Sequence, residues 1–256
     1  MGRVLVPTMG ALHHGHRALI QEGSKWGKVT VSIFVNPTQF APHEDFDTYP
    51  RDNEKDEMLA RLWGATGVWF PSSEEIYPHG PKVTECAGVL GGILEGEHRP
   101  GFFDGVLTVV SRLFDLFQPD IALFGEKDWQ QLQVVKRFAK ERGRPQILSV
   151  PTVRDADGLA ASTRNLYLTG GERERAHLFP QAFQVVRALW EKGERDRLTL
   201  EGAGLEVMGG ISKQLDYWEM WTDDLSKKPT LFEGKAVLLG ALRVGGVRMI
   251  DNTPLE

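Results

Sequence analysis

The chain has 256 residues, of which 41% are hydrophobic and 25% charged, a composition typical of a folded globular protein that excludes a disordered or fibrous one. A formal net charge of −5 leaves no basic footprint for nucleic acid, and the single cysteine, Cys86, excludes an intrachain disulfide and a cysteine-based metal cluster. No stretch approaches the roughly 20 apolar residues of a membrane span and the start shows no signal-peptide layout, so we expect a cytoplasmic protein with no nucleic-acid or membrane partner.

An apolar run near the start predicts a β-strand that is stopped by Pro7. Gly10 follows in a tight turn, and His13 and His16 then open a stretch with helical spacing. Such a junction presents backbone N–H groups and the positive end of a helix dipole, which favours phosphate. We therefore predict that His13 and His16 contact phosphate and that His14 is a surface residue. Zinc is the rival interpretation, but no cysteine or metalloprotease-type glutamate lies nearby.

The next elements alternate between strand and helix. Strands are predicted at 29–35, 68–71, 121–124 and 146–150, and helices at 52–63, at 106–117 and from 125 to about 142. This alternation favours an α/β fold, a parallel sheet with helices on both faces. Functional residues of such folds gather beyond the carboxyl ends of the strands. The irregular excursion over 72–101 is of the kind that is usually functional.

Polar segments follow two of these strands. Asn36 and Gln39 come after the second strand, and Gly125-Glu126-Lys127-Asp128 comes after the strand at 121–124. Lys127 is placed to meet phosphate, and Asp128 can accept from ribose hydroxyls or cap the helix. A solvated helix start explains a Lys-Asp pair equally well, so this segment alone does not decide its role.

The second half of the chain begins with a polar loop of small residues over 150–165. Its end carries Ser162, Thr163 and Arg164, two hydroxyls and a guanidinium that would suit a phosphate clamp, although a plain connection is the alternative. A charged amphipathic helix is predicted from 169 to about 192, a weakly helical glycine-rich stretch at 198–215, and strands at 217–222, 235–244 and 247–250. We place a domain boundary after residue 165, at the end of the polar loop, with a first domain over 1–165 and a smaller α+β domain over 166–256.

Five motifs in this order resemble the pantothenate synthetase (pantoate–β-alanine ligase) family of the two-histidine nucleotidyltransferase superfamily. They lie at residues 7–16, 34–40, 105–110, 124–131 and 153–165. The resemblance implies ATP-dependent condensation of (R)-pantoate with β-alanine through a pantoyl adenylate, with release of AMP and pyrophosphate. It also implies a homodimer with a Rossmann-like nucleotide- and pantoate-binding domain and a C-terminal domain that forms a lid over the site.

The same resemblance implies the site residues. The ATP site would comprise Met9, Gly10, Ala11, Leu12, His13, His14, Gly15, His16, Gly125, Glu126, Lys127, Asp128, Val153, Ala161, Ser162, Thr163 and Arg164. Pantoate and β-alanine would be bound by Asn36, Gln39 and Gln131, with Gln130 an ordinary surface amide. Catalysis would fall to His13, His16, Lys127 and Arg164, with His16 as proton donor. Magnesium would arrive with ATP, with no dedicated cage and Asp56 a weak candidate for an outer-sphere role.

The chemistry suits these residues, because an acyl adenylate activates a carboxylate without any protein nucleophile. The chain departs from the family pattern at Phe102, where histidine is expected, and at Ala161 and Thr163, which replace methionine and serine. Two alternatives stay open: a nucleotidyltransferase of the same fold with another acceptor, and a non-catalytic nucleotide-binding relative.

Overall fold

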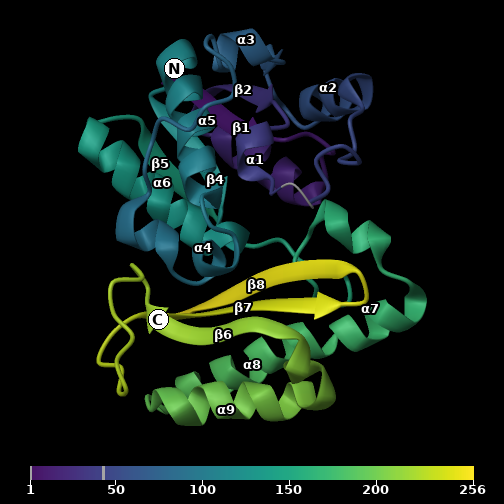
Figure 1. Ribbon diagram of the computed structural model, residues 1–256, viewed down its shortest axis with the longest axis vertical. Helices are drawn as coiled ribbons and strands as arrows, with labels where there is room; N and C mark the ends of the chain where they lie inside the picture. The colour runs from purple at the N-terminus through teal and green to yellow at the C-terminus, as the bar shows by residue number, and fades with distance from the viewer. Residues whose placement is uncertain (1, 42–43) are drawn as a thin grey trace. The chain divides into compact units, whose positions relative to one another are not determined.

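A parallel sheet forms the centre of the first part of the chain (Figure 1). In the computed structural model, which describes residues 2–41 and 44–256, this sheet has five strands in the order β3-β2-β1-β4-β5. The strands are β1 (Gly2–Thr8), β2 (Gly27–Ile33), β3 (Gly67–Trp69), β4 (Ile121–Gly125) and β5 (Gln146–Val150). The chain order reverses between β1 and β4, which makes this pair the topological switch point where such folds bind ligands.

Helices cover both faces of this sheet, as predicted. Val4 and Val6 of β1 pack with Leu19 of α1 and Ala60 of α2 in one apolar cluster. Because side chains alternate along a strand, Leu5 points to the other face, where α5 and α6 pack against each other and the sheet. The helices are α1 (His14–Gly23), α2 (Asn53–Leu62), α5 (Phe102–Phe117) and α6 (Trp129–Arg142).

Pro7 does not stop β1, contrary to the prediction. The strand continues to Thr8, and its ladder with β2 runs the whole way, from Gly2 paired with Gly27 to Thr8 paired with Ile33. The ladder between β1 and β4 is much shorter and pairs Val4 with Ile121 and Leu5 with Ala122. The pairing of the two central strands therefore stops short of their carboxyl ends.

The excursion over 72–101 is built from short helical segments, and a buried glutamine holds it. Gln130, which is 4% exposed, donates to the carbonyl groups of Leu90 and Ile93 at 2.8 and 2.7 Å and accepts from the N–H of Glu95 at 3.0 Å. The prediction of a surface amide was wrong because the excursion folds back over α6. Its segments are α3 (Ser73–Ile76), η2 (Gly88–Gly92) and α4 (Glu95–His98).

The second part of the chain is an antiparallel sheet with helices packed on it (Figure 1). Among the described residues its three strands lie in the order β6-β7-β8. Gly245, with a φ of +59°, makes the predicted turn between the last two strands. The predicted helix over 169–192 is interrupted at His177. The elements are α7 (Gly170–Ala176), α8 (Leu178–Glu191), α9 (Arg197–Met208), β6 (Leu215–Thr222), β7 (Ala236–Val244) and β8 (Val247–Leu255).

Helix α9 forms in spite of the glycines that predicted only weak helix. Gly204 is buried against the indole of Trp218, and a Cβ atom at this position would lie 2.3 Å from the ring. Gly202 on the same helix is exposed and faces open space. Gly204 therefore allows α9 to approach β6 closely, and this packing compensates for the low helix propensity of glycine.

The chain divides after Pro151 into two compact units, not after residue 165. Arg154 makes a bidentate ion pair with Asp251 of β8 at 2.7 and 3.0 Å. Arg173 of α7 holds Asp155 and Asp157 at 2.8 and 2.6 Å. These pairs fasten the loop over 152–165 to the second unit, so the predicted boundary was about fourteen residues too late. Among the described residues, every helix is too short or too polar to span a bilayer.

Candidate active site

The turn between β1 and α1 is shaped by a carboxylate from another helix. Gly10 and Ala11 both adopt left-handed backbone conformations, with φ of 84° and 51°. The N–H groups of Ala11 and Leu12 each donate to one oxygen of Asp56, both at 2.8 Å. Asp56 lies in α2 and is 2% exposed. Its role is to bind the turn directly, which differs from the outer-sphere role near magnesium that the sequence suggested.

Other N–H groups of this turn are also paired within the protein. The N–H of Gly10 donates to Thr8 Oγ1 at 3.3 Å, that of His13 to His16 Nδ1 at 3.1 Å, and that of Gly15 to His13 Nδ1 at 3.1 Å. We predicted that backbone N–H groups here would meet phosphate. The structure directs several of them to Asp56 and to the histidine rings, so these N–H groups are already paired within the protein.

The two histidines form a reciprocal cap at the start of α1. Because Nδ1 of each ring accepts a backbone N–H, the proton of each neutral imidazole lies on Nε2. The ring centroids are 4.2 Å apart. Among the residues that the structure describes, Nε2 of His16 has no hydrogen-bond partner. His14 is exposed, as predicted.

His16 is held in its neutral form. Burial lowers the pKa of His16 well below its usual range, and the neighbouring His13 and the charge of Lys127 lower this pKa further. A neutral imidazole donates a hydrogen bond from Nε2 without carrying the positive charge of an acid catalyst. The role of His16 as proton donor, which the resemblance implied, stays a prediction.

Lys127 stands at the end of β4, the other strand of the switch point. The strand runs into a 3₁₀ turn, η3 (Glu126–Asp128), before α6 begins. The Lys127 ammonium, 21% exposed, lies 3.3 Å from Asp128 Oδ1, and Glu126 accepts from the Ser149 hydroxyl at 2.8 Å. Asp128 occupies the N-cap position, but its side chain accepts no capping hydrogen bond. The capping role is therefore not seen, and the ribose contact stays a prediction.

Gln39 lies beyond β2, at the end of η1 (Pro37–Gln39), and is oriented by the residues around it. Its Nε2 donates to Met9 Sδ at 2.9 Å, and its Oε1 accepts from Asn36 Nδ2 at 3.0 Å. Asn36 itself is 1% exposed. Its Nδ2 also donates to the Gly105 carbonyl at 3.1 Å, and its Oδ1 accepts from the Tyr77 hydroxyl. Asn36 therefore positions Gln39, and its contact with pantoate stays a prediction.

Arg99 fixes the main chain at Gln39. Its guanidinium makes two hydrogen bonds of 2.7 Å with Glu44 and donates to the Gln39 carbonyl at 3.1 Å. The same guanidinium lies over the Phe102 ring, 3.8 Å from its centroid. Phe102 thus supplies a π face to this arginine.

Gln131 is half-buried in α6, and in the part of the chain that the structure describes its amide makes no hydrogen bond. The amide of its neighbour Gln130 instead donates to main-chain carbonyl groups of the excursion over 72–101. The contact of Gln131 with pantoate stays a prediction.

The predicted phosphate-binding residues of the second unit lie on an ordered hairpin. Ala161 donates its N–H to the Val153 carbonyl at 2.9 Å, and Ser162 Oγ accepts from the N–H of Arg164 at 3.3 Å at the start of η4 (Thr163–Tyr167). Asn165 is 4% exposed and donates to Asp155 and to the Ala160 carbonyl. Ala161 is only 3% exposed, so its methyl group offers little surface to a nucleotide.

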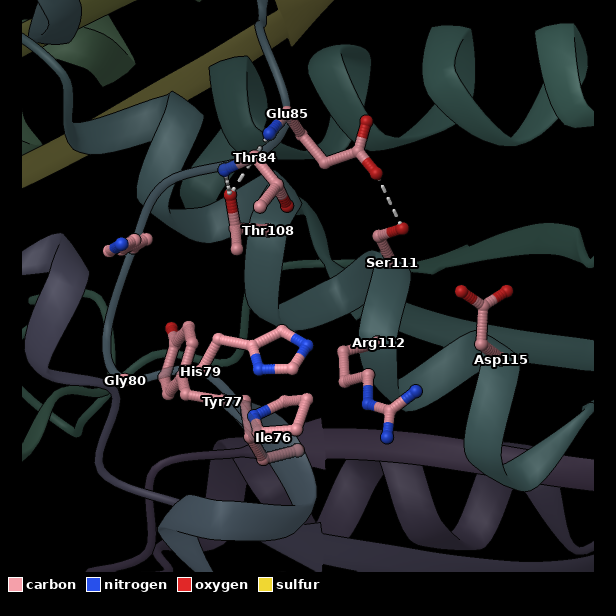
Figure 2. Close-up of a pocket in the computed structure, with 12 residues that line it drawn as sticks. Ile76, Tyr77, His79, Gly80, Thr84, Glu85, Thr108, Ser111, Arg112 and Asp115 are labelled. Carbon is pink, nitrogen blue, oxygen red and sulfur yellow. Dashed lines mark hydrogen bonds between the residues drawn. The ribbon is translucent and has the colours of Figure 1, made fainter.

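A further cavity of about 470 Å³ lies in the first unit among α3, α5 and the segment after α3. Figure 2 shows the His79 ring and the Arg112 side chain on one wall and Glu85, which accepts from the Ser111 hydroxyl at 2.7 Å, on another. Its lining residues include none of those predicted to bind ATP, pantoate or β-alanine. Tyr77 borders it and also contacts Asn36.

A family model described as pantoate-beta-alanine ligase matches residues 2–254. The chain belongs to this family. It is 45% identical to a pantothenate synthetase of Acidothermus cellulolyticus, over 98% of this chain and 84% of the relative, and 44% identical to that of Aquifex aeolicus, over 98% and 90%. These findings confirm the resemblance that the five motifs indicated.

Solved structures of this ligase family share the fold. A crystal structure of pantothenate synthetase from Thermus thermophilus matches with a TM-score of 0.93 and 39% identity, over 99% of this chain and 93% of that one. A pantoate-beta-alanine ligase of Francisella tularensis, complexed with beta-gamma ATP and beta-alanine, matches with a TM-score of 0.76 and 32% identity, over 98% and 89%. The predicted α/β fold with a smaller C-terminal α+β part is confirmed.

The ligase has residues at its site that its sequence did not reveal. Asp56 lies 45 positions from Ala11, and Arg99 lies 60 positions from Gln39, so no local pattern links them. For metal ions, no group of three or more His, Cys, Asp or Glu side chains suited to hold one occurs among the described residues. The groups that gather at the switch point are imidazoles, an ammonium and amides, which suit phosphate and a small carboxylate.

Proposed function

We propose that this ligase condenses (R)-pantoate with β-alanine at the expense of ATP, through a pantoyl adenylate. The observation that carries the proposal is the switch point itself, where the two capping histidines follow β1 and Lys127 follows the neighbouring strand β4. The Francisella relative, which was solved in complex with beta-gamma ATP and beta-alanine, supports the choice of substrates.

In the first step, a carboxylate oxygen of pantoate attacks the α-phosphorus of ATP and the bond to pyrophosphate breaks. Negative charge then grows on the phosphate oxygens and on the leaving pyrophosphate. Nε2–H groups of His13 and His16 and the Lys127 ammonium are the donors that would stabilise this charge. Magnesium would arrive with ATP as part of the substrate, bound by its phosphates.

In the second step, the amine of β-alanine attacks the acyl carbon and AMP leaves, while the amine gives up a proton. Gln39 and Gln131 would bind pantoate through its hydroxyls and carboxylate, and neutral amides do so without pairing the carboxylate so strongly that it loses its nucleophilicity. On the second unit, we assign Ser162, Thr163 and Arg164 to the phosphates of ATP.

The proposal extends to the working form of the enzyme. We infer a homodimer in the cytoplasm, where ATP is available, and we assign the second unit the role of a lid. Light scattering on the purified protein tests the dimer: a mass of about twice 28.7 kDa is expected, and a monomer at micromolar concentration would contradict it.

The decisive experiment is isotope exchange. Radioactive pyrophosphate should enter ATP only when pantoate is present, and AMP should accumulate only when β-alanine is added as well. Exchange that depends on a different acid would favour a nucleotidyltransferase with another acceptor. ATP binding without turnover for any acid would favour a non-catalytic relative.

A further inference from the structure

The buried carboxylate of Asp56 meets the histidine turn at its backbone N–H groups. Both of its oxygens accept backbone N–H groups, from Ala11 and Leu12, at 2.8 Å. Hydrogen bonds from N–H to a carboxylate are roughly twice as strong as neutral ones, and this pair is shielded from water because Asp56 is 2% exposed. The N–H groups at the head of the turn are therefore committed to Asp56.

Asp56 is not needed to start its own helix. Asp52 fills that role, since its Oδ1 accepts from the N–H of Lys55 at 3.1 Å at the N-cap position of α2. Asp56 lies one turn further along, and the hydrogen bonds of its side chain go to the turn between β1 and α1. A negative charge near the amino end of α2 is also favourable for that helix, although this effect alone would not require burial.

The turn itself is fitted to this carboxylate. A Cβ atom at Gly10 would lie 2.8 Å from Asp56 Oδ2, so the backbone approaches the carboxylate as closely as a glycine allows. The next residue, Ala11, has a φ of 51°, a left-handed conformation that is uncommon for a residue with a side chain. Such a conformation persists where the surroundings hold it, and here the Ala11 N–H is held by Asp56.

We propose that Asp56 is a positioning residue for ATP activation in this ligase. By fixing residues 10–12 it sets the start of α1, where each histidine ring accepts a backbone N–H on Nδ1 and so carries its proton on Nε2. By occupying the turn's N–H groups it leaves phosphate to be met by imidazoles, whose donors can be aimed at the α-phosphate. This inference rests on the proposed function, because it takes ATP as the substrate.

The test compares Asp56→Asn with Asp52→Asn, the same change at the exposed cap of the same helix. An amide at position 56 must turn its NH₂ toward one of the two N–H donors, so the turn loses a hydrogen bond and gains a repulsion. We expect Asp56→Asn to lower pantoate-dependent pyrophosphate exchange by about 10²-fold. Asp52→Asn should stay within about 2-fold of the parent, because asparagine caps helices as well as aspartate does.

A double-mutant cycle separates positioning from general damage. In a His16→Ala background, Asp56→Asn should cost less than about 3-fold, because the ring that Asp56 positions is already gone. If the fold-losses in exchange of the two single variants multiply in full in the double variant, Asp56 acts independently of His16 and the proposal is overturned. So would a folded Asp56→Asn variant with exchange within about 3-fold of the parent.

Histidine ring nitrogens give a readout that does not depend on turnover. In ¹⁵N NMR spectra, the parent and Asp52→Asn should show His16 as the Nε2–H tautomer, and Asp56→Asn should shift these signals. Unchanged signals would overturn the inference, and a parent with this tautomer but no pantoate-dependent exchange would overturn only the proposed function. If Asp56→Asn does not fold, Gly10→Ala tests the same contact from the other side, with a comparable loss of exchange expected and near-parent exchange contradicting the inference.

Discussion

Single residues in this protein combine structural and chemical tasks. His13 and His16 cap a helix with Nδ1, and this cap fixes which nitrogen carries the proton. Asn36 is buried so that Gln39 presents its amide in one orientation. In both cases the side chain that would meet substrate is oriented by hydrogen bonds already made in the absence of substrate, which lowers the cost of ordering it on binding.

The lowered pKa of His16 makes a prediction for stability against pH. In the unfolded chain this histidine has an ordinary pKa of about 6.5, whereas burial, His13 and Lys127 hold it lower in the folded protein. As the pH falls below about 6.5, the unfolded state binds a proton at this histidine that the folded state does not. The free energy of unfolding therefore falls with falling pH, by up to about 1.4 kcal/mol per pH unit from this group. Urea unfolding at pH 7.5 and 5.5 should show a smaller loss in His16→Gln than in the parent. Equal losses would contradict the shift.

Elements in this fold are positioned by close contacts as much as by propensity. Helix α9 contains two glycines with opposite surroundings, Gly204 against Trp218 and Gly202 facing open space. A scale of helix propensities treats them alike and predicts a weak helix, but packing decides the outcome at the buried position.

Alanine at these two glycines should change stability in opposite directions. Gly204→Ala places a methyl group against the Trp218 ring and should destabilise the protein by about 1–3 kcal/mol through overpacking. Gly202→Ala should stabilise it by about 0.4–1 kcal/mol, because the unfolded chain loses freedom and nothing in the fold is disturbed. Chemical denaturation of both variants measures this. Changes of the same sign would refute the role of close packing at Gly204.

At the scale of the whole molecule, the division into two units depends on ion pairs between distant residues. Arg154 reaches Asp251, which is 97 positions away and whose side chain is 3% exposed. That pair explains why the hairpin over 152–165 belongs to the second unit. The sequence shows a polar loop there, and its partner lies on the last strand, so the boundary could not be read locally.

Breaking this pair should be costly. The side chain of Asp251 is 3% exposed and that of Arg154 is 32% exposed, so the pair is only partly shielded from water. Asp251→Asn removes the negative charge and weakens both hydrogen bonds, which should cost about 1.5–3 kcal/mol. The exposed pair of Lys235 with Glu256 is the control, and Glu256→Gln should change stability by less than about 1 kcal/mol. Thermal and urea unfolding of both variants decide the matter. Similar effects in the two would show that Arg154 does not anchor the hairpin.

The features of this protein that the sequence predicted correctly are those encoded by residues close to one another in the chain. Alternating strands and helices indicated the α/β fold, and the spacing of the five motifs indicated the ligase family, including His16, Lys127 and Gln39. Asp56 was misjudged because its backbone partners lie 44 and 45 positions away in the sequence. Gln130 was misjudged because its partners lie 35 to 40 positions away. Only the folded backbone brings these groups together. The ATP and pantoate contacts assigned to individual residues stay predictions.

Pro7 has one more consequence for the switch point. Consecutive residues of a strand direct their backbone groups to opposite neighbours, and the Thr8 carbonyl accepts from the Phe34 N–H on the β2 side, so Pro7 faces β4. Proline has no N–H to donate. The ladder between β1 and β4 stops at Leu5 and Ala122 and cannot be lengthened through Pro7. The missing N–H of Pro7 thus keeps the hydrogen bonding between β1 and β4 from extending toward the carboxyl ends of these strands, beyond which the histidine turn and Lys127 lie.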